Sequence, residues 1–278
     1  MYNDLFSIGP VTVHMYGVMT GLGILAAYWL ASVRAKEKNL TETAVDKIFG
    51  LVIACVAVGY LCSKILYIIT IFPHLLDGTM SLRNAITGGW VVIGGLLGGI
   101  LGAWLYCKWN KLDLWIYFDV AFPGVALAQA LGRIGCFFAG CCYGKETTGP
   151  LYIMFTHSDF GPNNVHLIPT QLIMSAGDFL LVLALVFYGK KLQKKEGEIA
   201  GLYLMLYSLG RFCVEFLRGD VLRGQVGVLS TSQFIGLFTA FGGVLLFLYA
   251  RKRTETPREK LAGMIKSADV KDTEIRKN

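Results

Sequence analysis

Charged side chains are scarce in this sequence. Only 16% of its 278 residues are Asp, Glu, Lys or Arg, whereas 54% are hydrophobic, and the mean hydropathy is +0.54. Soluble globular domains carry about 25% charged residues. The composition therefore excludes a pair of ordinary soluble domains and indicates a membrane protein.

Basic residues are missing from the start of the chain, where no Lys or Arg precedes Arg34. A cleaved signal peptide begins with a basic segment, so we do not expect the first apolar run to be one.

The net charge is +7, but the basic residues form short clusters between apolar runs, without the basic face that binds nucleic acid. We therefore expect no nucleic-acid partner.

Long apolar runs occupy most of the chain. A helix needs about 20 mainly apolar residues to cross a membrane, and seven runs meet this length. An odd number of spans puts the two termini on opposite sides. The runs cover about 11–33, 48–72, 88–107, 114–140, 170–189, 199–217 and 230–250.

The basic residues are concentrated in alternate loops between these runs. The positive-inside rule assigns such loops to the cytoplasm, so we expect the N-terminus outside and the C-terminus in the cytoplasm. The rich loops hold Arg34, Lys36, Lys38 and Lys47, then Lys108 and Lys111, then Lys190, Lys191, Lys194 and Lys195, then Arg251, Lys252 and Arg253, whereas the opposite loops hold Arg83, Lys145, Arg218 and Arg223.

These features predict an all-α polytopic membrane protein. Its seven-helix membrane domain is expected over 1–253, followed by a charged cytoplasmic tail over 254–278. The segment 143–169 contains the turn signals Gly149–Pro150 and Gly161–Pro162. We expect this segment to form a small ordered head on the periplasmic or extracellular side.

The third run contains glycines at a spacing of four, namely Gly94, Gly98 and Gly102. Small residues at this interval let helix backbones approach closely in lipid, which favours a packing seam over a ligand-facing role. No strand precedes these glycines and no P-loop lysine follows, so a nucleotide-binding loop is not predicted.

Ionisable residues inside the runs indicate a polar site, because such residues usually face a cavity or a partner. Arg133 and Asp119 lie in one run but about four helical turns apart, so each needs another partner.

Arg211 and Glu215 stand at i, i+4, which fits either an internal salt bridge or a substrate role for Glu215. Two arginines without enough carboxylates to neutralise them predict an anionic ligand, and the natural one is a lipid phosphate.

Three cysteines follow Arg133 in the stretch GRIGCFFAGCCYG. Cys136, Cys141 and Cys142 could bind zinc with His157 or His166, although adjacent cysteines are awkward tetrahedral ligands and no CxxC is present. They could be a redox relay at the oxidising outer face. They could also be small apolar packing residues, as buried cysteines usually are.

Several stretches form an ordered set along the chain, namely VTVHMYGVMTGLGILAAYWLA, GGWVVIGGLLGG, ALGRIGCFFAGCCYG, IPTQL and LYSLGRFCVEFLR. In this order they resemble the prolipoprotein diacylglyceryl transferase family over roughly residues 9–250. The most specific piece is Gly-Arg-Ile-Gly followed by Phe and a closing Gly, supported downstream by Arg-Phe-x-x-Glu-Phe-x-Arg.

The resemblance implies a multi-pass enzyme of the bacterial cytoplasmic (inner) membrane with its N-terminus outside. Members transfer the diacylglyceryl group of phosphatidylglycerol to the thiol of a lipobox cysteine in a prolipoprotein signal peptide. The products are a thioether and glycerol phosphate. The expected partners are thus phosphatidylglycerol, other membrane lipid and the prolipoprotein, with no cofactor.

The resemblance also implies roles for single residues. Arg133 and Arg211 would hold the head-group phosphate and offset its charge as it leaves. Asp119 matches an acidic position that we expect to be structural. The expected catalytic residues are Arg133, Arg211, Tyr207 and Glu215, and the expected substrate-binding residues are Tyr16, Arg133, Cys136, Gly144, Gln171 and Arg218, with no metal ligand among them.

The chain departs from the family pattern at polar positions. Relatives commonly have a histidine where this chain has Ile93 and a glutamate where it has Met174, and they have amide and carboxylate groups where it has Cys136 and Cys141. The missing histidine removes one general base for the acceptor thiol. Glu215, His14 and the tyrosines are the candidates to replace it.

Two other classes of function stay open. A thiol-redox membrane protein would use Cys136, Cys141 and Cys142, and a non-catalytic protein would bind or transport phospholipid. Within the transferase hypothesis, Cys136 or Cys141 could also act as a covalent relay for the lipid group.

Overall fold

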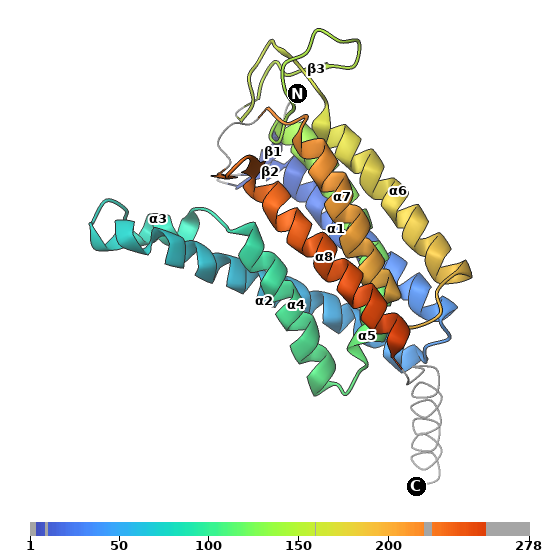
Figure 1. Cartoon of the computed structure of the whole chain (residues 1–278). Helices are drawn as coiled ribbons and strands as arrows, with labels where there is room; N and C mark the ends of the chain where they lie inside the picture. The colour runs from blue at the N-terminus through green and yellow to red at the C-terminus, as the bar shows by residue number, and fades with distance from the viewer. Residues whose placement is uncertain (1–3, 9–10, 159, 220–223, 254–278) are drawn as a thin grey trace, which may run out of the picture. The chain divides into compact units, whose positions relative to one another are not determined.

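The computed structural model describes residues 4–8, 11–158, 160–219 and 224–253 (Figure 1). Within these ranges the protein is mainly helical, and six helices are long and apolar enough to cross a membrane. This confirms the polytopic α-helical class. The predicted tail over 254–278 lies outside the described residues. The chain forms two compact units, one of residues 1–38 and 118–278 and the other of residues 39–117.

The unit of residues 39–117 is built on two long helices that pack on each other. Gly98 shows how close they come, because a Cβ atom there would lie 2.7 Å from the carbonyl oxygen of Val58. Gly94 and Gly102 make equally close approaches to the same helix, which confirms the predicted packing seam. The helices of this unit are α2 (Glu42–Leu76), the short α3 (Leu82–Thr87) and α4 (Val92–Trp109).

The larger unit is a bundle in which α7 (Glu198–Glu215) lies between α6 (Thr170–Lys191) and α8 (Thr231–Lys252) (Figure 1). Helix α1 (Met15–Glu37) packs on α5 (Leu114–Ala139), where a Cβ on Gly124 would lie 2.6 Å from the carbonyl oxygen of Ala27. The bundle core is apolar and contains the fully buried side chains Ala126, Leu185 and Ile199.

Large apolar side chains also cover the outer faces of the helices. Leu25, Leu180 and Phe238, on α1, α6 and α8, are each more than 60% exposed. Such faces are stable in hydrocarbon, where all the backbone polar groups of a helix are satisfied within the helix. The exposed surface therefore fits the lipid phase that the hydropathy predicts.

The structure changes the predicted spans in detail. Residues 11–14, placed in the first span, form a strand that pairs with the preceding one, and Ile8 stands opposite Val11. The predicted helix over 199–217 is present as α7, but it carries Glu198, Arg211 and Glu215 and is not among the six apolar candidates. The paired strands are β1 (Asp4–Ile8) with β2 (Val11–His14), β3 (Ile153–Met154) with β4 (His166–Leu167) and β5 (Gln225–Val226) with β6 (Leu229–Ser230).

Candidate functional site

A tight turn ends α5 and carries the thiols. Gly140 adopts φ +72°, and its N–H donates to the carbonyl of Phe137. The N–H of Cys141 donates to the carbonyl of Cys136. This pair of hydrogen bonds is the Schellman motif, in which the residue after the left-handed glycine folds back over the last helical turn. The motif therefore places Cys141 beside Cys136.

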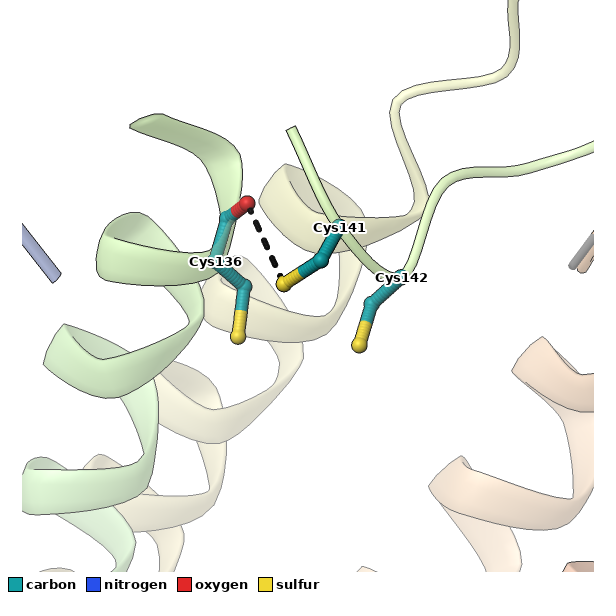
Figure 2. A group of neighbouring side chains, drawn as sticks. All are labelled: Cys136, Cys141 and Cys142. Atoms are coloured by element: carbon teal, nitrogen blue, oxygen red, sulfur yellow. Dashed lines mark hydrogen bonds between the residues drawn. The ribbon is translucent and has the colours of Figure 1, made fainter. Parts of the chain in front are cut away.

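The three thiols of this turn form one cluster. The Sγ atoms of Cys136, Cys141 and Cys142 all lie within 4.8 Å of one another. Figure 2 shows the sulfur atoms turned to one side of the turn, with Cys141 Sγ donating to the Cys136 carbonyl at 3.7 Å. Neither His157 nor His166, the histidines considered as possible zinc ligands, joins the cluster among the described residues, and His166 stacks on Tyr152 instead.

The segment after the turn is fixed by side chains at the start of α6 and by the residue Ile168 just before it. Gln171 is fully buried and donates through Nε2 to the Cys141 carbonyl at 2.8 Å. Thr170 donates to the Cys142 carbonyl at 2.9 Å. Gly144 fits against Ile168, whose carbonyl oxygen would lie 2.5 Å from an added Cβ. Gln171 and Gly144, predicted to bind substrate, thus hold the thiol-bearing segment in place, and their contact with substrate stays a prediction.

Arg218 extends the site from the end of α7. Its side chain is buried, and its backbone bridges to Gly144. The pKa of the Cys142 thiol is lowered by its surroundings. The larger cause is hydrogen bonding with the Cys136 and Cys141 thiols, and the smaller cause is the charge and hydrogen bond of the Arg218 guanidinium. The end of the bundle that carries this turn therefore joins a cationic group to a thiol cluster.

Arg133 lies less than one helical turn before Cys136 on α5 and faces α6 and α7. Its guanidinium interacts electrostatically with the Tyr207 hydroxyl and lies near the carboxylate of Asp178. Asp178 is only 5% exposed, and its Oδ2 atom has no hydrogen-bond partner among the described residues. Asp178 is a candidate functional residue that was not predicted from the sequence, although a lone acidic residue inside an apolar run is the same kind of signal as Arg133.

A cavity of about 270 Å³ opens between α6 and α7. Its walls are mainly apolar and include Met174, Leu181 and Leu206, while Asp178, Tyr207 and Arg211 supply the polar groups. An apolar cavity with a few convergent polar groups is the usual form of a small-molecule site. Such a cavity suits a molecule with a hydrocarbon part and an anionic head.

Arg211 and Glu215 form an internal salt bridge, which is one of the two interpretations that their spacing allows. Arg211 also donates through Nη2 to Ser232 Oγ on α8 at 3.1 Å. Both charged side chains are largely buried, so each depends on the other for its charge compensation. The salt bridge is therefore confirmed, and it leaves the guanidinium of Arg211 on the cavity wall.

The remaining predicted residues have different surroundings. Tyr16 packs against Gly135 of α5 and lies near the thiols of the turn. His14 is paired with Asp4 at 2.6 Å.

Asp119 is fully buried and accepts from the backbone N–H groups of Gly197 and Ala200 at 2.7 and 3.1 Å, which supports its expected structural role. Ile93 belongs to the unit of residues 39–117.

Guanidinium groups gather at this part of the protein. Arg211 lines the cavity, Arg133 lies near Asp178 of the cavity wall, and Arg218 lies beside the thiol cluster. Charged groups inside a membrane protein usually face a cavity or a partner. Arginine also presents a planar fork of donors that matches a phosphate. The arrangement is suited to holding the phosphate of a lipid whose chains lie along the apolar walls.

Comparison with known proteins gives one family. The family model for prolipoprotein diacylglyceryl transferase matches residues 3–249. A phosphatidylglycerol–prolipoprotein diacylglyceryl transferase of Clostridium tetani is 44% identical over 251 residues, covering 90% of this chain and 98% of the relative. A relative with the same name and the number 2, from Clostridium perfringens, is 44% identical over 257 residues, covering 90% and 97%. A Clostridioides difficile relative of this name is 30% identical over 250 residues, covering 90% and 96%. The chain therefore belongs to the prolipoprotein diacylglyceryl transferase family.

Proposed function

We propose that this protein transfers the diacylglyceryl group of phosphatidylglycerol to the lipobox cysteine of a prolipoprotein. The products are a thioether-linked lipid and glycerol phosphate. Family membership supports the reaction, and one structural observation locates it at this site: the Arg211 guanidinium lies on the wall of an apolar cavity, and Arg133 lies near Asp178 of the same wall. That combination fits a lipid with one anionic phosphate.

The reaction exchanges one bond for another at a glycerol carbon. The acceptor thiolate forms a sulfur–carbon bond while the bond from that carbon to the phosphate oxygen breaks. Negative charge then develops on the departing glycerol phosphate, where the guanidinium groups of Arg133 and Arg211 offset it. Loss of one such donor typically reduces kcat by about 10²–10³. The protein contributes mainly by positioning the two substrates and by this electrostatic stabilisation.

The carboxylates and Tyr207 orient the arginines in this proposal. Asp178 lies near Arg133, and Glu215 pairs with Arg211. Tyr207 interacts electrostatically with Arg133 and lies on the cavity wall. These contacts hold both guanidinium groups before the lipid arrives, which reduces the reorganisation needed in the transition state.

The topology expected for this reaction is a multi-pass protein of the bacterial cytoplasmic membrane. Seven spans would include α7, whose charged Arg211 and Glu215 face partners within the bundle rather than lipid. The N-terminus and the head over 143–169 would lie outside, and the C-terminus would be cytoplasmic, as the distribution of basic loops indicates. This orientation places the thiol-bearing turn on the outer side, where it can meet an exported prolipoprotein.

Mass spectrometry tests the reaction directly. The purified protein is incubated in detergent with phosphatidylglycerol and a synthetic lipobox peptide, and the peptide is examined for a diacylglyceryl mass gain. The wild-type protein and Arg251→Ala should both give the product, because Arg251 contacts Tyr188 and Glu198, outside the cavity. Arg133→Ala should remain folded and give none. An active Arg133→Ala variant would refute the anchoring role, and no product from the wild type would refute the transferase.

A further inference from the structure

The thiol cluster has dimensions that suit a metal ion. Zinc binds thiolates at about 2.3 Å with tetrahedral angles, which puts two sulfur ligands about 3.8 Å apart. The sulfur atoms of Cys136, Cys141 and Cys142 already lie within 4.8 Å of one another. Closing the remaining gap of at most about 1 Å requires only small side-chain rotations.

The cluster supplies three ligands rather than four. Among the described residues, no His, Asp or Glu joins these cysteines in the group. Structural zinc sites are closed by four protein ligands, whereas catalytic sites have three and leave the fourth position for water or substrate. A zinc ion in this cluster would therefore have one position open to an exogenous ligand.

The surrounding charge favours such an ion. One Zn²⁺ with three thiolates carries a net charge of −1. The guanidinium groups of Arg133 and Arg218 both interact electrostatically with the cysteines of the cluster. Buried thiolates without a cation among them would be less stable, and the two nearby guanidinium groups stabilise the negative charge of the zinc–thiolate group.

Two of the candidate bases for the acceptor thiol are paired with other side chains. Glu215 is bound to Arg211, and His14 to Asp4. Covalent transfer through Cys136 would give a thioether, and this bond is too stable to pass the lipid on. A metal ion offers another route, because a coordinated thiol is deprotonated outright.

We propose that Cys136, Cys141 and Cys142 hold a zinc ion whose fourth position binds the acceptor thiol as a thiolate. This proposal rests on the proposed transferase function. Coordination releases the thiol proton to water. The sulfur then gives an electron pair to the glycerol carbon, and the carbon–oxygen bond breaks with its electron pair leaving on glycerol phosphate. The neutral thioether is a weak ligand and dissociates, which returns the zinc site to its open form. No oxidant or reductant is consumed.

Metal binding is measured first, without reference to transfer. The purified protein, kept reduced with a phosphine, is analysed for zinc by elemental mass spectrometry and is then titrated with Co²⁺. We expect one zinc per chain and the absorption bands of tetrahedral thiolate-bound cobalt. Serine variants of Cys136, Cys141 and Cys142 should lose both signals. The matched control Cys213→Ser, at an exposed cysteine of α7, should keep them. Retention of both signals in the three cluster variants, or their absence from the wild type, would overturn the proposal.

Acceptor binding is measured on the cobalt protein with two lipobox peptides that differ only in Cys or Ser at the acceptor position. The Cys peptide should shift the thiolate bands and the Ser peptide should not. Identical spectra with both peptides would overturn the open-position role. Because these spectra do not depend on product formation, they separate this proposal from the transferase itself.

The transfer assay supplies the final comparison. A thiol with a pKa of about 8.5 is only about 3% ionised at pH 7, so full ionisation by the metal raises the thiolate population up to about thirtyfold. Chelation should therefore lower transfer at pH 7 by up to that factor, with less effect near pH 9, and added zinc should restore it. Full transfer by the metal-free wild type would overturn the metal role while the transferase function stands.

Discussion

Gly140→Ala tests the turn that assembles the thiol cluster. Gly140 has φ +72°, a conformation that L residues rarely adopt. An added Cβ would also lie 2.1 Å from Ser158 Oγ and 2.7 Å from Ser158 Cβ. Alanine must therefore either strain the backbone and displace Ser158 or unwind the Schellman turn that places Cys141 beside Cys136.

The magnitude follows from these two effects. Holding an L residue in the left-handed region costs about 1–2 kcal/mol. Displacing Ser158 breaks the hydrogen bonds that its Oγ accepts from the N–H groups of Phe160 and Gly161 at 3.2 and 2.9 Å, each worth about 1 kcal/mol. We therefore expect Gly140→Ala to lower the free energy of unfolding by about 3–4 kcal/mol.

Unfolding of the detergent-solubilised protein by titration with SDS measures this change. Gly21→Ala on α1 is the matched control, because nothing lies within 4 Å of its added Cβ, and alanine there should be neutral or stabilise by up to about 1 kcal/mol. Adding Ser158→Gly to Gly140→Ala removes the overlapping atoms but not the backbone strain. Equal stabilities of Gly140→Ala and Gly21→Ala would refute the account of this turn.

Other variants test the packing seam, the internal carboxylate and the cavity. Gly98→Ala should destabilise by about 2 kcal/mol because its Cβ meets backbone atoms of α2, whereas Gly99→Ala, with its nearest such atom at 4.0 Å, should be neutral in the same SDS titration. Asp119→Ala should lower the free energy of unfolding by about 3 kcal/mol because it leaves two buried N–H groups without an acceptor; an unchanged midpoint would contradict this. Glu215→Gln should reduce kcat/KM for phosphatidylglycerol about tenfold by loosening Arg211, and Arg211→Ala should reduce it about a thousandfold, as measured by peptide lipidation. Equal activity of all three proteins would exclude this pair from the reaction.

Much of the site could be predicted from the sequence, because a charge inside an apolar run is visible without a structure. Arg133, Arg211 and Glu215 were identified in this way, and the spacing of the last two allowed their salt bridge as one of two interpretations. The same signal is present at Asp178, but only the structure shows its approach to Arg133, which joins α6 to α5. Contacts between helices depend on how the helices pack, which sequence spacing does not specify.

The thiol cluster shows the same limit. CxxxxCC is a poor match to known metal-ligand spacings, and the sequence left its role open between zinc, redox chemistry and packing. The left-handed Gly140 and the hydrogen bonds from Thr170 and Gln171 bring the sulfur atoms within 4.8 Å. Those bonds come from a helix some thirty residues further along the chain.

The sequence by itself determined the membrane class, most of the helices, the glycine seam and the charged residues that need a partner. These properties depend on hydropathy, charge and helical spacing, and each can be evaluated within one run of the chain. Only the tertiary structure decided which charges share the cavity, that α7 carries its charges between α6 and α8, and that three cysteines face one another. Those features arise from the packing of segments far apart in sequence. The burial of each side chain there depends on which side chains from the other segments the fold places around it.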